Sequence, residues 1–363
     1  METPPSPGSR DAITGAILGT AVGDAIGLPY EGLSRRRAAR LLGEPDRHRF
    51  FLRRGMVSDD TEHSCIVMQA LIAAGDDEEL FVKNLASRMR LWLLGLPAGI
   101  GRATLKATLK LWLGVSPRRS GVFSAGNGPA MRSAVLGAAI EDVTLLQRLV
   151  RASTRITHTD PKAEYGAMAV ALAANMASRG TLADGAEYLT TLREILTCNE
   201  AGHDDANELL SLLEKTVDSV SRRESTRDFA DSLGLSSGVS GYTYHTVPIA
   251  VHASLLKKDN PRGAIMDVVS CGGDADTTAA IVGGIVGAGV GPDGIPDDWL
   301  DGIYEWPRTV RWMQSLADQL AESRSEKSPT RPARLSFAGI AARNLVFTLA
   351  VFIHALRRLL PPY

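Results

Sequence analysis

The sequence predicts a mostly α-helical domain, and three observations lead to that prediction. From Asp11 onward the chain is dominated by Ala, Leu, Arg and Glu, and apolar residues recur every three or four positions, as on one face of an α-helix. The clearest examples span residues 61–74, 80–95, 163–178 and 276–291. Few segments alternate with a period of two, and the segment from Tyr242 to Val247 fits a short strand or a helix start equally well. We therefore expect an all-α fold.

Composition narrows the class of protein. The chain has 363 residues, of which 44% are hydrophobic and 22% charged, and its net charge is −1. Such a chain forms a sizeable core, and it has no overall basic field, so nucleic acid is not an expected partner. Cys65, Cys198 and Cys271 neither form a disulfide framework nor have zinc-site spacing, which predicts a reducing, cytoplasmic setting. The first eleven residues lack the basic start and apolar run of a secretory signal.

Changes in composition divide the chain into four parts. Residues 1–10 are rich in Pro, Ser and Gly and predict a loose tail, followed by one helical domain over 11–320. Residues 321–334 are charged and rich in Ser and Pro, which is typical of a linker. Residues 335–363 form an apolar helical extension whose uncharged core, Asn344 to Leu356, is shorter than the roughly 18 residues of a membrane span. We expect it to pack on the domain; a helix in the plane of a membrane or an oligomer contact remains open.

The first helix carries glycines spaced by four residues, at Gly15, Gly19, Gly23 and Gly27. This spacing places all four on one face of a single helix, although each glycine costs about 1 kcal/mol relative to alanine. Another backbone or a ligand is expected to approach that face closely. The alternative is a helix that is rich in glycine by chance.

Two acidic motifs each stand directly before an apolar helix. The first is Ser58-Asp59-Asp60-Thr61 and the second is the seven-residue segment from Gly272 to Thr278, GGDADTT. Oxygen-bearing side chains at these positions are good helix caps, which is the plain structural explanation. The same oxygens are also hard ligands that suit Mg²⁺, Mn²⁺ or Ca²⁺. If the two helix starts meet, their carboxylates repel one another, and a cation would neutralise them.

Three polar turns are further candidates, each with an ordinary structural alternative. The glycine-rich turn 126–132, GNGPAMR, exposes backbone N–H groups that suit phosphate or sugar oxygens, but it also fits a plain turn. The turn 157–161, THTDP, presents His158 before a helix, where a histidine is commonly structural. The turn 27–32, GLPYEG, ends the glycine-faced helix and presents Glu31, which also fits a surface glutamate.

These pieces, in this order, resemble the ADP-ribosylglycohydrolase family. The family's opening GxxxGxxxGDAxG…E is similar to residues 15–32, its (S/T)DDT to 58–61, its GNGxAMR to 126–132 and its THxDP-like turn to 157–161. Its GGDxDTxAAIxGxIxGAxxG is similar to residues 272–291, and its iPxxW is similar to residues 295–299. The resemblance spans roughly residues 11–315, and the two acidic motifs together make it specific.

The resemblance implies a compact, orthogonally packed all-α catalytic domain with two divalent cations, Mg²⁺ or Mn²⁺, at the bottom of a cleft. The implied metal ligands are Ser58, Asp59, Asp60, Asp274, Asp276 and Thr277. The implied substrate is ADP-ribose joined through C1″ to a protein side chain or small acceptor, and ADP-ribose is the product. The implied substrate-binding residues are Gly126, Asn127, Gly128, Met131, His158, Gly241 and Tyr242.

The chemistry of this cleavage agrees with the implied residues. Breaking the C1″ bond builds positive charge on the ribose, which carboxylates stabilise, and metal ions position and activate water. Glu31 or Asp60 is expected as the catalytic acid or base, with Glu31 preferred for its place in the motif.

Two departures from the family pattern leave the acceptor open. Pro97 and Ala98 stand where some arginine-directed members carry an acidic residue, and His245 stands where many carry Asp. Arginine linkage is the first expectation, with serine or another linkage as alternatives. A non-catalytic ADP-ribose-binding or structural relative is the competing reading; competent side chains at all six ligand positions and at Glu31 favour the enzyme. Membrane contact through the C-terminal helix is compatible with either.

Overall fold

The computed structural model describes residues 4–182, 184–197 and 203–359, and within them it contains helices and no β-sheet. The expected all-α class is confirmed, and the segment at Tyr242 to Val247 is the start of a helix. The α-helices are α1 (Arg10–Gly27), α2 (Arg35–Leu41), α3 (Asp59–Ala74), α4 (Glu78–Leu94), α5 (Arg102–Trp112), α6 (Pro117–Ser120), α7 (Ala134–Ala139), α8 (Val143–Arg155), α9 (Pro161–Ser178), α10 (Gly185–Thr197), α11 (His203–Ser221), α12 (Thr226–Ser232), α13 (Thr243–Leu256), α14 (Pro261–Ser270), α15 (Ala275–Val290), α16 (Asp297–Leu300), α17 (Val310–Glu326) and α18 (Phe337–Arg357).

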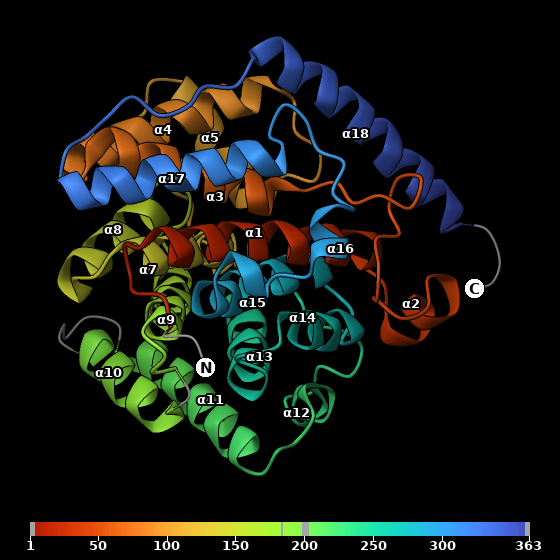
Figure 1. Cartoon of the computed structure of the whole chain (residues 1–363). Helices are drawn as coiled ribbons and strands as arrows, with labels where there is room; N and C mark the ends of the chain where they lie inside the picture. Colours follow the sequence, from red (N-terminus) through yellow and green to blue (C-terminus); the bar gives the residue numbers. More distant parts are fainter. Residues whose placement is uncertain (1–3, 183, 198–202, 360–363) are drawn as a thin grey trace.

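Helices α1 and α15 pack against each other through the centre of the molecule (Figure 1). A Cβ added at Gly19 would lie 2.0 Å from the carbonyl oxygen of Gly283, and one at Gly15 would lie 2.1 Å from that of Gly287. Only backbones without side chains at these positions can approach so closely. The close approach predicted for the glycine face is therefore confirmed, and the partner is the helix that carries the second acidic motif.

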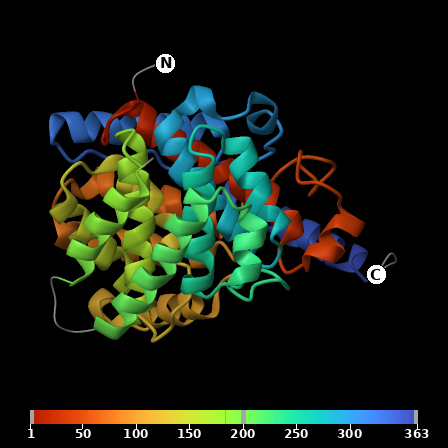
Figure 2. The same cartoon turned by 90° about the horizontal axis from the view of Figure 1, so that it is seen from below.

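The central pair lies between two groups of helices. Helices α3, α4, α5, α17 and α18 lie on one side of α1 in Figure 1, and α9 to α14 lie on the other. In Figure 2, which shows the molecule from below, helices α9 to α14 lie in front of the other group. Because α1 and α15 run antiparallel, the end of α1 at Gly27 lies against the beginning of α15 at Ala275. This pairing places the turn after α1 next to the second acidic motif.

The segments around the domain differ in part from the sequence expectations. Within the expected tail, the N–H of Gly8 donates to the carbonyl of Ala138 at 2.8 Å, and Ser9 caps α1. The expected linker start at Ala321 is wrong, because α17 continues to Glu326. The extended segment that follows lies on the domain, since Thr330 N–H donates to the carbonyl of Ile72 at 2.9 Å.

The C-terminal helix α18 lies on the domain, although not through the side chains that its sequence suggests. Its buried residues are Arg343, Asn344, Phe347, Ala350 and His354. Its large apolar residues Leu345, Leu349, Phe352, Ile353 and Leu356 are exposed instead. By length and apolarity, α18 and the segment Arg10–Tyr30 are the two described helices that could cross a membrane. Arg10–Tyr30 is wholly buried as the core helix, whereas only 28% of the α18 window is buried.

Candidate active site

A cleft of about 710 Å³ opens where the ends of α1, α3 and α15 meet. Its walls come from segments far apart in the sequence, among them residues 28–32, 98–104, 124–131 and 239–241. Most of the residues expected from the sequence line it: Glu31, Ser58, Asp59, Gly126, Asn127, Gly128, Met131, His158, Gly241, Asp274, Asp276 and Thr277. The fold therefore gathers both acidic motifs and all three polar turns around one cavity.

The first acidic motif is held in place by Asp24 of α1. The N–H of Ser58 donates to both oxygens of the Asp24 carboxylate, at 3.0 and 2.8 Å, and the Thr61 hydroxyl donates to it at 2.6 Å. Asp24 is fully buried, and its burial raises its pKa to about 6 although these hydrogen bonds oppose the rise. The last turn of the core helix thus anchors the first turn of α3, and that contact fixes the position of Asp59 and Asp60.

The second acidic motif depends on two glycines in the left-handed region. Gly272 and Gly273 have φ of 70° and 83°, and a Cβ on Gly273 would lie 1.9 Å from the carbonyl oxygen of Val239. Gly273 N–H donates to the carbonyl of Leu33 at 2.9 Å, and Asp274 N–H donates to that of Val239 at 2.7 Å. The paired glycines allow the chain to pass between the loops at Leu33 and Val239 and then to start α15. Asp274 and Asp276 line the cleft as a result.

The two acidic helix starts meet. The Thr277 hydroxyl donates to an Asp60 oxygen at 3.4 Å, and the Asn127 amide donates to Asp274 at 2.6 Å. Burial raises the pKa of Asp60 and Asp276 well above the ordinary value, and the neighbouring negative carboxylates raise it further. Asp59 is affected in the same way. The repulsion expected from the sequence is therefore present, because these carboxylates share one small region.

The residues at this centre fit divalent cations. The oxygens Asp60 Oδ1 and Asp276 Oδ1 are buried and have no hydrogen-bond partner. The hydroxyls of Ser58 and Thr277 supply further hard oxygen donors close to them. The described residues contain no preformed group of three or more His, Cys, Asp and Glu side chains arranged to hold a metal ion, so the fit rests on the unpaired carboxylate oxygens and the hydroxyls together.

Glu31 lies at the entrance of the cleft, just after the end of α1. The loss of water around its carboxyl raises its pKa, the nearby Asp274 raises it further, and Arg358 of α18 opposes the rise. A carboxyl with a raised pKa beside a cleft is suited to hold and transfer a proton. Its backbone carbonyl accepts a hydrogen bond from the Arg358 side chain at 2.8 Å, which ties the cleft entrance to α18.

The two polar turns form another part of the cleft wall. Asn127 donates to both Asp274 and Thr246, so its side chain is fixed against the acidic centre. The His158 ring faces the cleft and has its Nδ1 2.9 Å from the Thr157 hydroxyl. Burial lowers the pKa of His158 to about 3, so this ring is a neutral hydrogen-bonding group. Both side chains are suited to polar contacts with a ligand.

Arg132, from the same glycine-rich turn, is structural. It is buried away from the cleft, where it donates to the Ser153 hydroxyl and carbonyl and to the Thr157 hydroxyl at 2.8–3.0 Å. It therefore holds the turn at residues 157–161 in place behind the wall. Asp160 caps α9 by accepting from Lys162 N–H at 3.0 Å.

Two expected residues do not line the cleft. Asp60 lies beneath it, where its carboxylate accepts from the Ser58 hydroxyl at 2.9 Å. Tyr242 lies behind Gly241, and its hydroxyl accepts from Lys162 at 3.1 Å while its ring packs on Tyr244. His245 lies beside Ser240, also outside the lining.

Two features of the site were not among the expected residues. Asp24 belongs to the GDA segment of the first motif, and a carboxylate inside a glycine-lined apolar helix is the signal that could have identified it. Phe347 and Val351 of α18 form part of the cleft wall together with Leu28 and Ala98. No local pattern distinguishes these two from the other apolar residues of α18.

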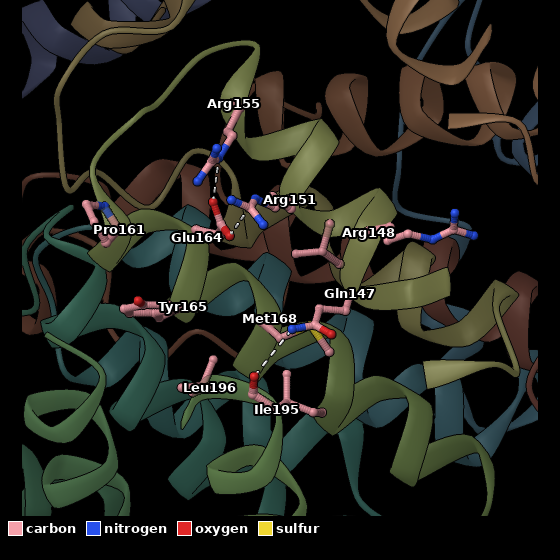
Figure 3. Close-up of a pocket in the computed structure, with 11 residues that line it drawn as sticks. Gln147, Arg148, Arg151, Arg155, Pro161, Glu164, Tyr165, Met168, Ile195 and Leu196 are labelled. Atoms are coloured by element: carbon pink, nitrogen blue, oxygen red, sulfur yellow. Dashed lines mark hydrogen bonds and ion pairs between the residues drawn. The ribbon is translucent and has the colours of Figure 1, made fainter. Parts of the chain in front are cut away.

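A second pocket, of about 410 Å³, lies between α8, α9 and α10 and contains none of the expected site residues (Figure 3). In it Glu164 pairs with Arg155 at 2.9 Å and with Arg151 at 3.5 Å. Its carboxylate is matched by guanidinium groups, in contrast to the unmatched carboxylates of the cleft, and we do not assign it to the reaction.

Comparison with known proteins identifies the family whose sequences this chain matches. The sequence model of the family described as ADP-ribosylglycohydrolase matches residues 5–330. The chain belongs to the ADP-ribosylglycohydrolase family. The match covers the complete cleft except its α18 wall, so the expected family is confirmed and the protein is a hydrolase that acts on ADP-ribose linkages.

The alignments with relatives of this chain cover almost the full length of those relatives. An uncharacterized protein of Archaeoglobus fulgidus is 33% identical over 84% of this chain and 94% of its own length. A Rhodospirillum rubrum protein named ADP-ribosyl-(dinitrogen reductase) glycohydrolase is 29% identical over 81% of this chain and 90% of its own. The Homo sapiens protein named ADP-ribosylhydrolase ARH3 is 26% identical over 85% and 93%.

The fold is also similar to a solved one. A structure described as an ADP-ribosylglycohydrolase-related protein complex superposes with a TM-score of 0.62 at 24% identity, over 87% of this chain and 98% of that one. This likeness supports the assignment of the all-α fold.

Proposed function

We propose that this protein hydrolyses the C1″ glycosidic bond of ADP-ribose attached to a protein side chain and releases free ADP-ribose, with two divalent cations, Mg²⁺ or Mn²⁺, as cofactors. The observation that supports the proposal most directly is the pair of unpartnered buried oxygens, Asp60 Oδ1 and Asp276 Oδ1, at two helix starts joined by the Thr277–Asp60 contact. Buried polar atoms in native proteins are nearly always satisfied. A cation-binding centre gives these oxygens the partners they lack.

The metal ligands we assign are Ser58, Asp59, Asp60, Asp274, Asp276 and Thr277. Bound there, divalent cations supply a Lewis acid that orients ribose hydroxyls and acidifies water. The carboxylates around them stabilise the positive charge that develops on the ribose ring as the C1″ bond breaks. Asp24 keeps α3 in register for this role through its contacts with Ser58 and Thr61.

Glu31 is the residue we assign to proton transfer. It lines the cleft beside the acidic centre, together with Leu28, Ala98 and Phe347, and its pKa is raised. Protonated, it donates to the leaving atom of the acceptor; ionised, it accepts a proton from the attacking water. Asp60, beneath the cleft, is placed to bind metal rather than to reach the leaving atom.

The part of the cleft wall formed by the two polar turns binds the ADP-ribose moiety. The turn at Gly126 to Gly128 has the backbone flexibility for close approach to sugar or phosphate oxygens, and the neutral His158 and Asn127 offer side-chain hydrogen bonds. The acceptor therefore leaves on the Glu31 side. A guanidinium fits that side better than a neutral hydroxyl because Glu31 and Asp59 are acidic, and we assign arginine-linked ADP-ribose as the favoured substrate.

The reaction belongs to a reducing, cytoplasmic setting in this proposal. Cys65 and Cys271 are buried free thiols, and burial raises the pKa of each to about 12, so both are inert and unpaired.

A release assay tests the proposal. Peptides carrying ADP-ribose on arginine or on serine are incubated with the metal-free protein, with Mg²⁺ and with Mn²⁺, and free ADP-ribose is measured by chromatography. We expect release only with metal, and faster release from arginine. Full turnover in excess chelator would contradict the metal assignment, and faster release from serine would overturn the acceptor assignment.

A further inference from the structure

The C-terminal helix α18 exposes large apolar side chains on its outer side, where an ordinary surface helix is polar, and it buries three polar side chains, Arg343, Asn344 and His354. A surface helix buries its apolar stripe and exposes its polar one. In α18 the outward residues are instead large and apolar, with exposed fractions of 74% for Leu345, 58% for Leu349, 60% for Phe352, 53% for Ile353 and 47% for Leu356. These residues follow one another at spacings of three and four, so they form a continuous row, the outer face of α18.

Polar contacts on the opposite side fix this orientation. Arg343 forms a two-point ion pair with Glu305, with both N–O distances at 2.7 Å. The Asn344 amide donates to the carbonyl of Gly95 at 2.7 Å, and the His354 ring nitrogen lies 2.9 Å from the carbonyl of Pro29. Rotating the helix to bury its leucines would break all three contacts, so the apolar outer face belongs to the folded state.

The charged side chains of the C-terminal segment itself have one sign. Over residues 327–359 the chain has Lys327, Arg331, Arg334, Arg343, Arg357 and Arg358, and no Asp or Glu. The Arg37 side chain of α2 contacts the Arg358 carbonyl, which brings the basic helix α2 to the end of α18 (Figure 1). Arg36 of α2 and Arg357 are both exposed there. The outer face therefore joins apolar side chains to a basic end.

We propose that the outer face of α18 docks this protein in the plane of an anionic membrane surface. Its leucines and phenylalanine enter the acyl boundary, and the arginines at its end meet anionic headgroups. A second copy fits less well, because its C-terminal segment has no Asp or Glu to meet the basic end of this face. A spanning orientation would place Arg343, Asn344 and His354 in hydrocarbon after removing them from their partners.

Docking of this kind would hold the cleft beside the membrane. Phe347 and Val351, on the inward side of the same helix, line the cleft wall. The acceptors most accessible to the enzyme are then ADP-ribosylated proteins at a membrane surface. Helix α18 lies beyond the matched family region at 5–330, so this property is specific to chains that carry the extension.

Vesicle sedimentation of the full chain tests the proposal. Purified protein is mixed with phosphatidylcholine vesicles with or without phosphatidylglycerol, and the pelleted fraction is measured at low and high salt. We expect binding to the anionic vesicles, weakened by salt. The double substitution Leu349→Gln/Phe352→Gln removes two apolar anchors and should weaken binding roughly tenfold or more. Arg36→Gln/Arg357→Gln should weaken binding to anionic vesicles as well.

The matched control is Leu80→Gln. Leu80 is at the start of α4, whereas α18 contacts the opposite end of α4, at Gly95, so this exposed leucine lies away from the outer face of α18. Leu80 is 42% exposed, and its substitution should leave binding unchanged. Light scattering without vesicles tests the second-copy alternative. Failure of the full chain to bind anionic vesicles, equal binding by Leu349→Gln/Phe352→Gln, or a dimer that this variant abolishes would each overturn the proposal. ADP-ribose release from soluble peptide is measured in parallel. If neither the wild-type protein nor any variant releases ADP-ribose, the result contradicts the proposed function and not the docking.

Discussion

Helix α3 carries two clusters of buried carboxylates that are built in opposite ways. Asp59 and Asp60, at its start, join Asp24, Asp274 and Asp276, and none of these carboxylates forms an ion pair with a cationic side chain in the part of the chain that the structure describes. Glu62, two residues further on, forms an ion pair with Arg308 at 2.8 Å and lies 3.6 Å from Arg343, while its other oxygen accepts from the Trp92 indole. Arg343 also pairs with Glu305.

The difference is visible in the pKa values. In the cleft, burial and mutual repulsion raise the pKa of the carboxyls. At Glu62, burial acts in the same direction, but Arg308 and Arg343 outweigh it and lower the pKa below its ordinary value. The paired cluster holds α18 on the domain and is structural. The unpaired cluster is unfavourable by itself, which is typical of a site that is completed by a ligand.

The largest expected effect is on catalysis at the edge of the unpaired cluster. Glu31→Gln keeps the shape of the side chain and removes its proton transfer, so kcat should fall by roughly 10²- to 10⁴-fold. Calorimetric titration with ADP-ribose should show binding close to that of the wild-type protein. Wild-type turnover in this variant would assign Glu31 to the surface instead.

Removing the charge from the paired cluster should mainly affect stability. Glu62→Gln leaves Arg308 and part of the Arg343 charge buried without a partner, which should lower the free energy of unfolding by about 3–5 kcal/mol. Urea unfolding at neutral pH measures the change. The comparison fails if the substitution is as mild as one at an exposed position.

The equivalent change in the unpaired cluster should do the reverse for the metal-free protein. Asp276→Asn and Asp59→Asn each remove one repelling charge, so the metal-free fold should be as stable as the wild type or more stable. Affinity for Mg²⁺ or Mn²⁺ and activity should each fall by roughly tenfold or more, because even indirect metal partners have effects of that size. Unchanged metal affinity and activity would leave these residues as helix caps.

The last expected effect is a gradual one, on the pH dependence of stability. A carboxyl with a raised folded-state pKa, such as Asp24 at about 6, gives stability that is full below its unfolded pKa and lost as pH rises through the folded one. Glu62, with a lowered pKa, gives stability that is present above its unfolded pKa and lost as pH falls through the folded one.

The metal-free protein should therefore lose stability between about pH 4 and 7, by on the order of 3 kcal/mol for Asp24 alone. Thermal melts across this range should show a smaller loss in Asp276→Asn than in the wild type. Saturating Mg²⁺ should restore the wild-type melting temperature at the upper end of the range. A melting temperature that rises steadily with pH without metal would contradict the contrast between the clusters.

Much of the fold and site was predictable because the decisive signals are local. The spacing of Gly15, Gly19, Gly23 and Gly27 already favours a close neighbour, and the paired glycines of GGDADTT permit an unusual turn before a helix. The apolar periodicity over 61–74 and 163–178 predicts two helices. The observed helices, α3 and α9, end where the pattern ends and begin only two residues before it. Backbone conformation and helix periodicity depend on near neighbours in the chain, so the sequence carries them directly.

The sequence by itself determined the all-α class, the family and nearly all of the residues that gather at the cleft. The tertiary structure decided which carboxylates are paired and which are not, because Asp59, Asp60 and Glu62 differ only in which side of α3 they project from. It also decided that Asp24 supports the site from the core and that α18 turns its polar side inward. An apolar pattern says that a helix has a face to cover, whereas the partners available in space, here Glu305, Gly95 and Pro29, select the face that is buried.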